Sequence, residues 1–121
     1  MKQLCLSIRQ PWATAIVDGI KTIENRKGLK NFRGRFFVHA AKMVDLEGMQ
    51  WCIDNLSPEI MSKLDFQTGG IIGHATVIDC VQESDNEWFI GPNGFVLVKP
   101  KRIDFQPCNG QLGFFRREVR F

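Results

Sequence analysis

The feature that most constrains the fold is a long apolar run at residues 71–81, which opens directly after Gly69 and Gly70. Most of its residues are β-branched or small and apolar, which favours a strand buried inside a sheet. Gly73 interrupts the run near its start and predicts a bulge or a bend. A strand of this length suits the centre of a small barrel.

Shorter strands are predicted on both sides of this run. Leu4, Leu6 and Ile8 alternate with polar or small residues, so residues 3–8 are expected to form a half-buried first strand. The end of the sequence, at residues 110–121, fits either a one-turn helix or a closing strand. Further strands are predicted at residues 21–26, 35–41, 95–98 and 102–105.

Helices are predicted in two separate parts of the chain. Pro11 suits the first turn of a helix and a glycine follows at its end, so a helix is expected at residues 11–18. Apolar residues at helical spacing predict a helix at residues 45–56, and the cap Ser57 predicts a short helix that ends at residue 64. Because the helices are segregated from the strands, the expected fold is α+β, a β-barrel of five to six strands with helical insertions.

The composition is that of one ordered domain. The chain has 121 residues, of which 44% are hydrophobic, so a single domain spanning residues 1–121 is expected. The apolar stretch at the N-terminus is too short for a signal peptide. No apolar run approaches the roughly 20 residues that span a bilayer. We therefore expect a soluble, cytoplasmic protein with no membrane partner. The four cysteines are far apart in the sequence and are expected to be reduced: Cys5, Cys52, Cys80 and Cys108. Because they lack the spacing of metal ligands, no metal site is predicted. No cofactor is predicted either.

Charge is segregated along the chain although the net charge is only +3. Acidic residues dominate residues 43–65 and 79–87. If the two basic segments of the chain lie next to each other in the fold, they form a patch that attracts phosphates. The other interpretation is a solvated surface of mixed charge. The two basic segments contain Lys21, Arg26, Lys27, Lys30, Arg33, Arg35 and Lys42, and then Lys99, Lys101, Arg102, Arg116, Arg117 and Arg120.

Several short motifs occur in a fixed order. Leu-Ser-Ile-Arg-Gln-Pro-Trp-Ala at residues 6–13 is followed by Gly-Ile-Lys-Thr-Ile-Glu-Asn-Arg at residues 19–26, and Trp-Phe-x-Gly-Pro-x-Gly-Phe occupies residues 88–95. With Gly-Ile-Ile-Gly at 70–73 and Gly-x-Leu-Gly at 110–113, they closely resemble the signature of the ASCH (activating signal cointegrator homology) family. The resemblance implies a PUA-like barrel, related to folds that bind RNA. It also implies a cleft where the first two motifs and the Trp-Gly-Pro loop converge.

The residues of these motifs suit nucleic-acid binding. Arginine and lysine side chains bind phosphate, and an indole such as that of Trp12 stacks on an unpaired base, although Trp12 also suits a core anchor. The amides of Gln10 and Asn25 suit either the reading of a base edge or hydrogen bonds within turns and strand edges. The predicted nucleic-acid-binding residues are Arg9, Gln10, Trp12, Lys21, Asn25, Arg26, Lys27, Arg33 and Trp88.

Glu24 has two interpretations. Alternation along a strand places it beside Arg26, which predicts a structural salt bridge. It is also a candidate acid or base next to Lys21, whose amine would become reactive if it were desolvated. Small bacterial ASCH proteins include amidohydrolases that use a lysine, a threonine three residues later and a distant glutamate. Lys21 matches the lysine, but Glu24 stands at the threonine position, Thr22 is the nearest hydroxyl, and the distant acid is Glu83 or Glu87.

These observations give three functional hypotheses. The first is a domain that holds a nucleotide or single-stranded segment of nucleic acid, RNA rather than DNA, in a basic cleft. The second is a hydrolase that uses Lys21, Glu24 and Thr22 on an acylated cytidine nucleoside or, as a ribonuclease, on RNA. The third is a protein-interaction module that uses the acidic helices. The sequence carries no signal for an oligomeric state.

Overall fold

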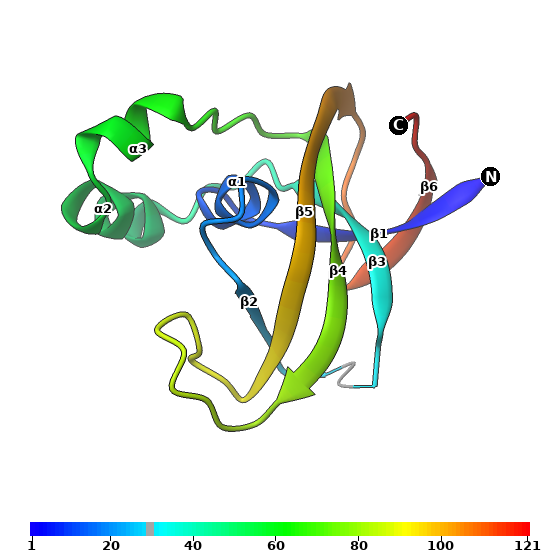
Figure 1. Ribbon diagram of the computed structural model, residues 1–121. Coiled ribbons are helices and arrows are strands. Elements are labelled where there is room, and N and C mark those ends of the chain that lie inside the picture. The colour runs from blue at the N-terminus through cyan, green and yellow to red at the C-terminus, as the bar shows by residue number, and fades with distance from the viewer. Residues whose placement is uncertain (29–30) are drawn as a thin grey trace.

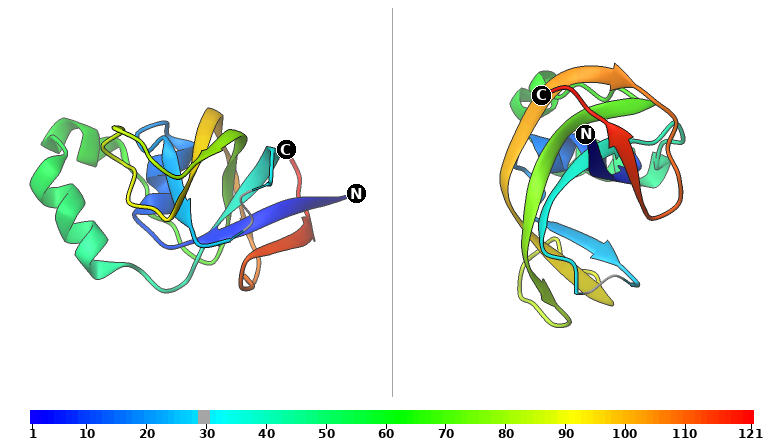
Figure 2. Two further views of the ribbon diagram at one scale, coloured as in Figure 1. Left: turned by 90° about the horizontal axis from the view of Figure 1, so that it is seen from below. Right: turned by 90° about the vertical axis from the view of Figure 1, so that its right-hand side faces the viewer.

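A computed structural model describes residues 1–28 and 31–121 of the chain. In this structure a single six-stranded sheet curls around a short helix, and two further helices lie to one side (Figure 1, Figure 2). The α+β class and the barrel of five to six strands are therefore confirmed. The elements are β1 (Lys2–Ile8), α1 (Trp12–Val17), β2 (Ile23–Arg26), β3 (Gly34–Ala40), α2 (Leu46–Asn55), α3 (Pro58–Lys63), β4 (Gly70–Val81), β5 (Asn93–Pro107) and β6 (Phe114–Glu118).

The apolar run forms β4, the strand that holds the middle of the sheet. The strand order is β2-β5-β4-β3-β1-β6, so β4 pairs with β3 and β5, and both pairs are antiparallel. The pairing of β4 with β5 shifts register between Ile71 and Gly73, as the glycine predicted. A Cβ at position 73 would lie 2.3 Å from the carbonyl oxygen of Lys101 and 2.8 Å from a methyl of Val17, so glycine lets β4 approach both β5 and α1.

One prediction about strands needs correction, and one alternative that the sequence left open is decided. The separate strands expected at residues 95–98 and 102–105 are one strand, β5, because the Lys99-Pro100 dipeptide between them is accommodated as a bulge. Lys99 adopts φ 53°, and the register shifts between His74 and Thr76 on the facing strand, so the proline lies where no ladder donor is required. The end of the sequence, which fitted a helix or a strand, forms β6 and pairs antiparallel with β1.

Side chains on the two faces of the sheet form two apolar clusters. Phe36 and Val38 of β3 point to the cluster that also contains α1, and Phe37 between them points to the other cluster. The larger cluster fixes α1, in which residues 13–17 are all buried. Because α1 directly follows β1, this packing also fixes the loop at residues 9–11 that joins the two elements.

Helices α2 and α3 are packed far less closely than α1. Asp45 accepts a hydrogen bond from the amide of Gly48 and caps α2, and Ser57 caps α3 in the same way, so both predicted helices are confirmed. In α2 only Gly48 and Cys52 are buried, and α3 has no buried residue. Among the described residues, no helix combines the length and the apolar character that crossing a membrane requires.

Candidate functional site

A cleft of about 730 Å³ opens between the sheet and α2. Its size lies within the range of roughly 300–1,000 Å³ that is typical of small-molecule sites. Its walls come from the end of β1, α1, β2, α2 and the loops at residues 82–92 and 108–113. The structure brings together there eight of the residues that the sequence singled out: Arg9, Trp12, Lys21, Glu24, Asn25, Arg26, Glu87 and Trp88.

Gln10 holds the turn between β1 and α1 and is not available to a ligand. The residue is fully buried, and its amide donates to Thr14 Oγ1 at 2.7 Å and to the carbonyl oxygen of Gln67 at 2.8 Å. Its own carbonyl oxygen accepts from the amide of Thr14 at 2.9 Å. The reading of a base edge is therefore corrected to the other interpretation, hydrogen bonding inside the protein. These bonds position the adjacent Trp12.

All three tryptophans of the chain meet in one wall of the cleft. The ring centroids of Trp12 and Trp51 are 6.0 Å apart, those of Trp12 and Trp88 are 6.2 Å apart, and those of Trp51 and Trp88 are 5.2 Å apart. The rings are inclined by 54° to 72°, which is a favourable arrangement of aromatic quadrupoles. We call these three residues the tryptophan wall. Trp12 serves both as an anchor, because it packs against the core, and as part of the cleft surface.

Beside this wall, Glu24 lies between two cations. Its carboxylate accepts a hydrogen bond from Arg26 Nε at 2.8 Å and lies 3.4 Å from Lys21 Nζ. The side chains of Lys21 and Glu24 are each only 8% exposed, which makes this a buried charged cluster. Burial lowers the pKa of the Lys21 amine, and the Glu24 carboxylate opposes that change. The expected salt bridge between Glu24 and Arg26 is present, and Lys21 shares it.

Asn25 positions the loop that carries Trp88. Its Nδ2 donates to the carbonyl oxygen of Trp88 at 3.0 Å, and its Oδ1 accepts from the amides of Ile90 and Gly91 at 2.9 Å and 3.0 Å. Most of the hydrogen-bonding capacity of the amide is thereby used within the protein. These bonds agree with the second interpretation of Asn25, hydrogen bonding at a strand edge, and the residue also lines the cleft.

Besides Gln10, three of the predicted site residues lie outside the cleft. Thr22 is exposed, and its hydroxyl accepts a hydrogen bond from Asn86, so it is not placed to act with Lys21. Lys27 is exposed, and Arg33 forms an ion pair with Asp79 at 3.5 Å. Both belong to the loop that joins the far end of β2 to β3, whereas the cleft lies beside α2. Lys30 of the same basic segment lies outside the described residues.

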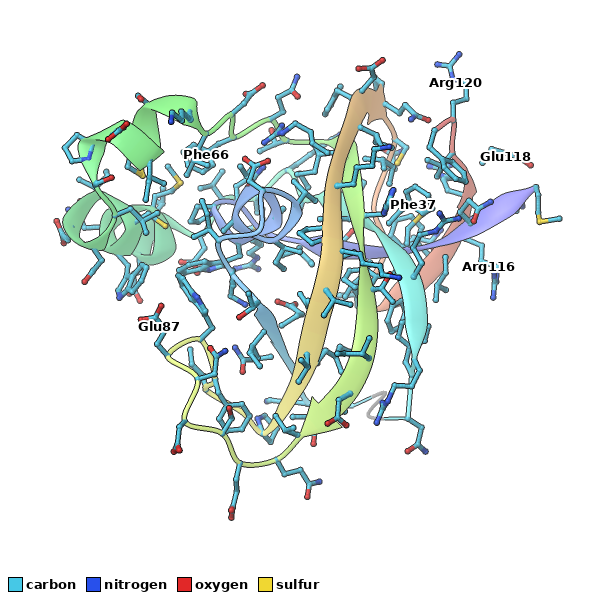
Figure 3. The ribbon with its side chains drawn as sticks, in the orientation of Figure 1. Phe37, Phe66, Glu87, Arg116, Glu118 and Arg120 are labelled. Atoms are coloured by element: carbon cyan, nitrogen blue, oxygen red, sulfur yellow. The ribbon has the colours of Figure 1, made fainter. Side chains whose placement is uncertain are left out.

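The charge of the cleft differs from the basic character expected. Arg9, Lys21 and Arg26 line it together with four acidic residues, so the lining is mixed. Three of the four acids come from the segments that separate the two basic regions along the sequence, and the fourth, Glu24, lies within the first basic segment. Figure 3 shows one of them, Glu87, where the 82–92 loop approaches α2. The acidic lining residues are Glu24, Asp45, Glu47 and Glu87.

Sequence reasoning missed the contribution of α2 to the cleft. Trp51 lies on this helix, and it completes the tryptophan wall with 41% of its surface exposed. The available signal was Gly48, because a glycine inside a helix is unfavourable unless something approaches closely. A Cβ at position 48 would lie 2.8 Å from Cζ2 of Trp12, so this glycine allows the helix to rest on the indole.

The rim of the cleft carries apolar side chains. Ile90 is 85% exposed and Leu112 is fully exposed, each at the tip of a loop that lines the cleft. Exposed apolar residues beside an aromatic surface favour a ligand with a flat, apolar part. Within residues 1–28 and 31–121, no three histidine, cysteine or acidic side chains converge as metal ligands.

Comparison with protein families and curated proteins gives consistent matches. A family model described as the ASCH domain matches residues 6–104. The sequence is 29% identical over 86 residues to Activating signal cointegrator 1 of Homo sapiens and to the protein of the same name of Mus musculus. Each alignment covers 65% of this chain and only 14% of the relative, so it concerns a small part of those proteins.

Solved structures with the same fold include two mutant forms of ZmASCH from Zymomonas mobilis. Each matches with a TM-score of 0.54, at sequence identities of 19% and 17%. The matches cover 88% and 95% of this chain, and 74% and 87% of those chains. At such identities the likeness concerns the fold, and it agrees with the PUA-like barrel implied by the motifs.

Proposed function

Because the chain belongs to the ASCH domain family, we propose that it binds single-stranded RNA and holds one unpaired base against the tryptophan wall. The observation that carries this proposal is the convergence of Trp12, Trp51 and Trp88 on one side of a cleft lined by Arg9 and Arg26. Every base has an aromatic face, and stacking on an indole does not require a net charge in the cleft. The mixed lining therefore favours a nucleoside part inside the cleft and phosphates at or beyond its rim.

Arg9 and Arg26 differ in how they would act on such a ligand. Arg26 is held in place, because its Nε donates to Glu24 and its Nη2 donates to the carbonyl oxygen of Ser7 at 2.9 Å. Arg9 is exposed at the end of β1 and suits a phosphate at the rim. Trp51 and the exposed Ile90 and Leu112 would lose contact with water when a base enters.

The composition of the chain supplies a direct assay. It contains three tryptophans and no tyrosine, so its intrinsic fluorescence comes from the tryptophan wall. Titration with short single-stranded RNA of mixed sequence should quench this fluorescence. Trp51→Ala should weaken binding by about 1–3 kcal/mol, the usual contribution of one stacked base. Ile53→Ala is the matched control, since Ile53 is on the same helix, is 58% exposed and does not line the cleft. Equal affinity of both variants and the unchanged protein would contradict the proposal.

A second candidate function is hydrolysis of a modified nucleoside or of RNA, and it rests on Lys21. This lysine lines the cleft, and its burial lowers the pKa of the amine, a change that favours a base or a nucleophile. Its Nζ also contacts the carbonyl oxygen of Ile23 and lies close to Glu24, which favours the protonated amine. Incubation with acylated cytidine and, separately, with RNA tests this function. Turnover that is abolished in Lys21→Ala but kept in Lys63→Ala would support it.

A further inference from the structure

A second groove, of about 480 Å³, lies at the opposite edge of the sheet from β2. Among its lining residues that the structure describes, Glu118 is the one acid, and it is engaged by the N-terminal amine at 3.1 Å. Three cations, by contrast, line this groove. The charge of the second groove is therefore clearly positive, unlike that of the cleft. The lining residues are Lys2, Pro107, Cys108, Gln111, Arg116, Arg117 and Glu118.

The pairing of β1 with β6 arranges these cations along a free edge. Gln3 faces Arg117 and Leu4 faces Arg116, and neighbouring residues of a strand point to opposite faces, so the two arginines flank the edge from both sides. Lys2 and Arg116 are exposed. The guanidinium of Arg117 donates to the carbonyl oxygen of Asn109 at 3.3 Å, while its buried Nε has no hydrogen-bond partner among the described residues. The exposed side chains of Lys2 and Arg116 suit phosphate oxygens.

The groove adjoins the cleft through one loop. Gln111 lines both, and the neighbouring Leu112 lines the cleft and is fully exposed. On the other side of the cleft the lining is acidic, with Glu47 on α2 and Glu87 on the 82–92 loop. Figure 3 shows Glu87 and Arg116 on opposite sides of the molecule. A polyanion that leaves the cleft is thus repelled on one side and attracted across Gln111 on the other.

We propose that the second groove binds the phosphates of the RNA strand whose base occupies the cleft. The inference rests on the proposed function and gives it a direction, because the strand runs from the tryptophan wall over the 108–113 loop to the β1–β6 edge. Lys2 and Ser7 lie at the two ends of this path on one strand, roughly 17 Å apart at the usual rise per residue. Binding of a base in the cleft should then not depend on the length of the RNA, whereas binding in the groove requires several linked nucleotides.

The test compares two double variants that each remove two positive charges. Lys2→Gln with Arg116→Gln changes the groove, and Lys63→Gln with Lys101→Gln changes exposed cations outside both sites. The probes are a single-stranded RNA of about 12 nucleotides, within the site sizes of single-domain binders, and the free nucleosides adenosine and cytidine. The binding of the RNA and of the nucleosides is measured by tryptophan fluorescence at several salt concentrations.

For the groove variant we expect the slope of log affinity against log salt for the 12-mer to fall by about 1.4, which is roughly 0.7 for each lost phosphate contact. If affinities converge near 1 M salt, this corresponds to about a 25-fold loss at 0.1 M. The control variant should keep the unchanged protein's slope, and nucleoside binding should be the same in all three proteins. If the double variant does not fold, the single variants Lys2→Gln and Arg116→Gln replace it in the same measurement. Each should show about half of the change in slope.

Two different results would overturn the inference. If the groove variant and the control bind the 12-mer equally while Trp51→Ala weakens it, the phosphates follow another path and the proposed function stands. If neither the 12-mer nor a nucleoside quenches the tryptophan fluorescence of the unchanged protein, the proposed function fails together with the inference.

Discussion

The sheet with α1 and helix α2 both line the cleft but are held in very different ways. The sheet side is built on fully buried side chains such as Phe36 and Phe95, and α1 is buried along its length. In α2 only Gly48 and Cys52 are buried. The difference teaches that the part of the cleft lining on the sheet and α1 is fixed by the core, whereas the part on α2 is fixed by a few specific contacts.

Those few contacts meet at Trp12 and Asp45. The Asp45 carboxylate accepts from the amide of Gly48 and from Nε1 of Trp12, each at 2.9 Å. The amide of Asp45 donates to the carbonyl oxygen of Gln10 at 2.9 Å, and Gly48 rests against the Trp12 indole. We call these contacts of α2 with Gln10 and Trp12 the junction. Changes on the sheet side should lower global stability, whereas changes at the junction should act first on the shape of the cleft.

The largest effect is expected for Glu24→Ala on the sheet side. It leaves Lys21 and Arg26 without their shared carboxylate in a buried setting, which should lower the free energy of unfolding by about 3 kcal/mol. Chemical denaturation monitored by circular dichroism measures this. Glu59→Ala is the control, because Glu59 pairs with Lys63 in solvent and should contribute less than about 1 kcal/mol. Equal losses in the two variants would show that the cluster does not stabilise the fold.

A smaller loss is expected for Gly48→Ala at the junction. The added methyl would overlap Trp12, and such overpacking costs about 1–3 kcal/mol, of which the better helix propensity of alanine returns about 1 kcal/mol. The emission of the tryptophan wall should change because Trp51 moves away from Trp12. Gly28→Ala, where a Cβ meets nothing within 4 Å, provides the matched control. An unaltered emission spectrum in Gly48→Ala would contradict the tight fit between α2 and the indole.

The smallest effect is expected from Asp45, and it depends on pH. Hydrogen bonds from Gly48 and Trp12 lower the pKa of its carboxyl below the ordinary 3.8. Its stabilising contribution is thus complete above about pH 4 and is lost as the pH falls through the lowered pKa. Asp45→Ala should cost about 1 kcal/mol at neutral pH, the usual contribution of a helix cap.

An acid titration of tryptophan emission checks this prediction. The unchanged protein should show a transition below about pH 4, and Asp45→Ala should show the acid-type emission already at pH 7. Identical titration curves for the two proteins would mean that Asp45 does not couple α2 to Trp12.

Much of the fold could be predicted because local patterns and the tertiary structure agree. The alternation at residues 3–8, the apolar run of β4, the helical spacing at residues 45–56 and the cap Ser57 all indicated the elements that are present. The error at β5 arose because Lys99 and Pro100 were placed between two separate strands. Only the pairing with β4 shows that this dipeptide is accommodated as a bulge.

The candidate site was less predictable, and individual residues show why. Gln10 and Asn25 carry amides that suit a base edge, yet each is used to hold a loop, because the fold supplies partners distant in sequence such as Gln67 and Trp88. Trp51 lay in a segment whose acidic composition pointed away from nucleic acid. Its approach to Trp12 and Trp88 depends on the position of α2, which no local pattern encodes.

By itself the sequence determined most of the strands, the helices and the cluster of Lys21, Glu24 and Arg26, because these depend on neighbours within a few residues. Only the tertiary structure decided that the three tryptophans share one wall, that acids line the cleft, and that the cations of β1 and β6 gather in a separate groove. The physical reason is that packing and electrostatic interactions act over distances in space. The curled sheet and the placement of α2 set those distances.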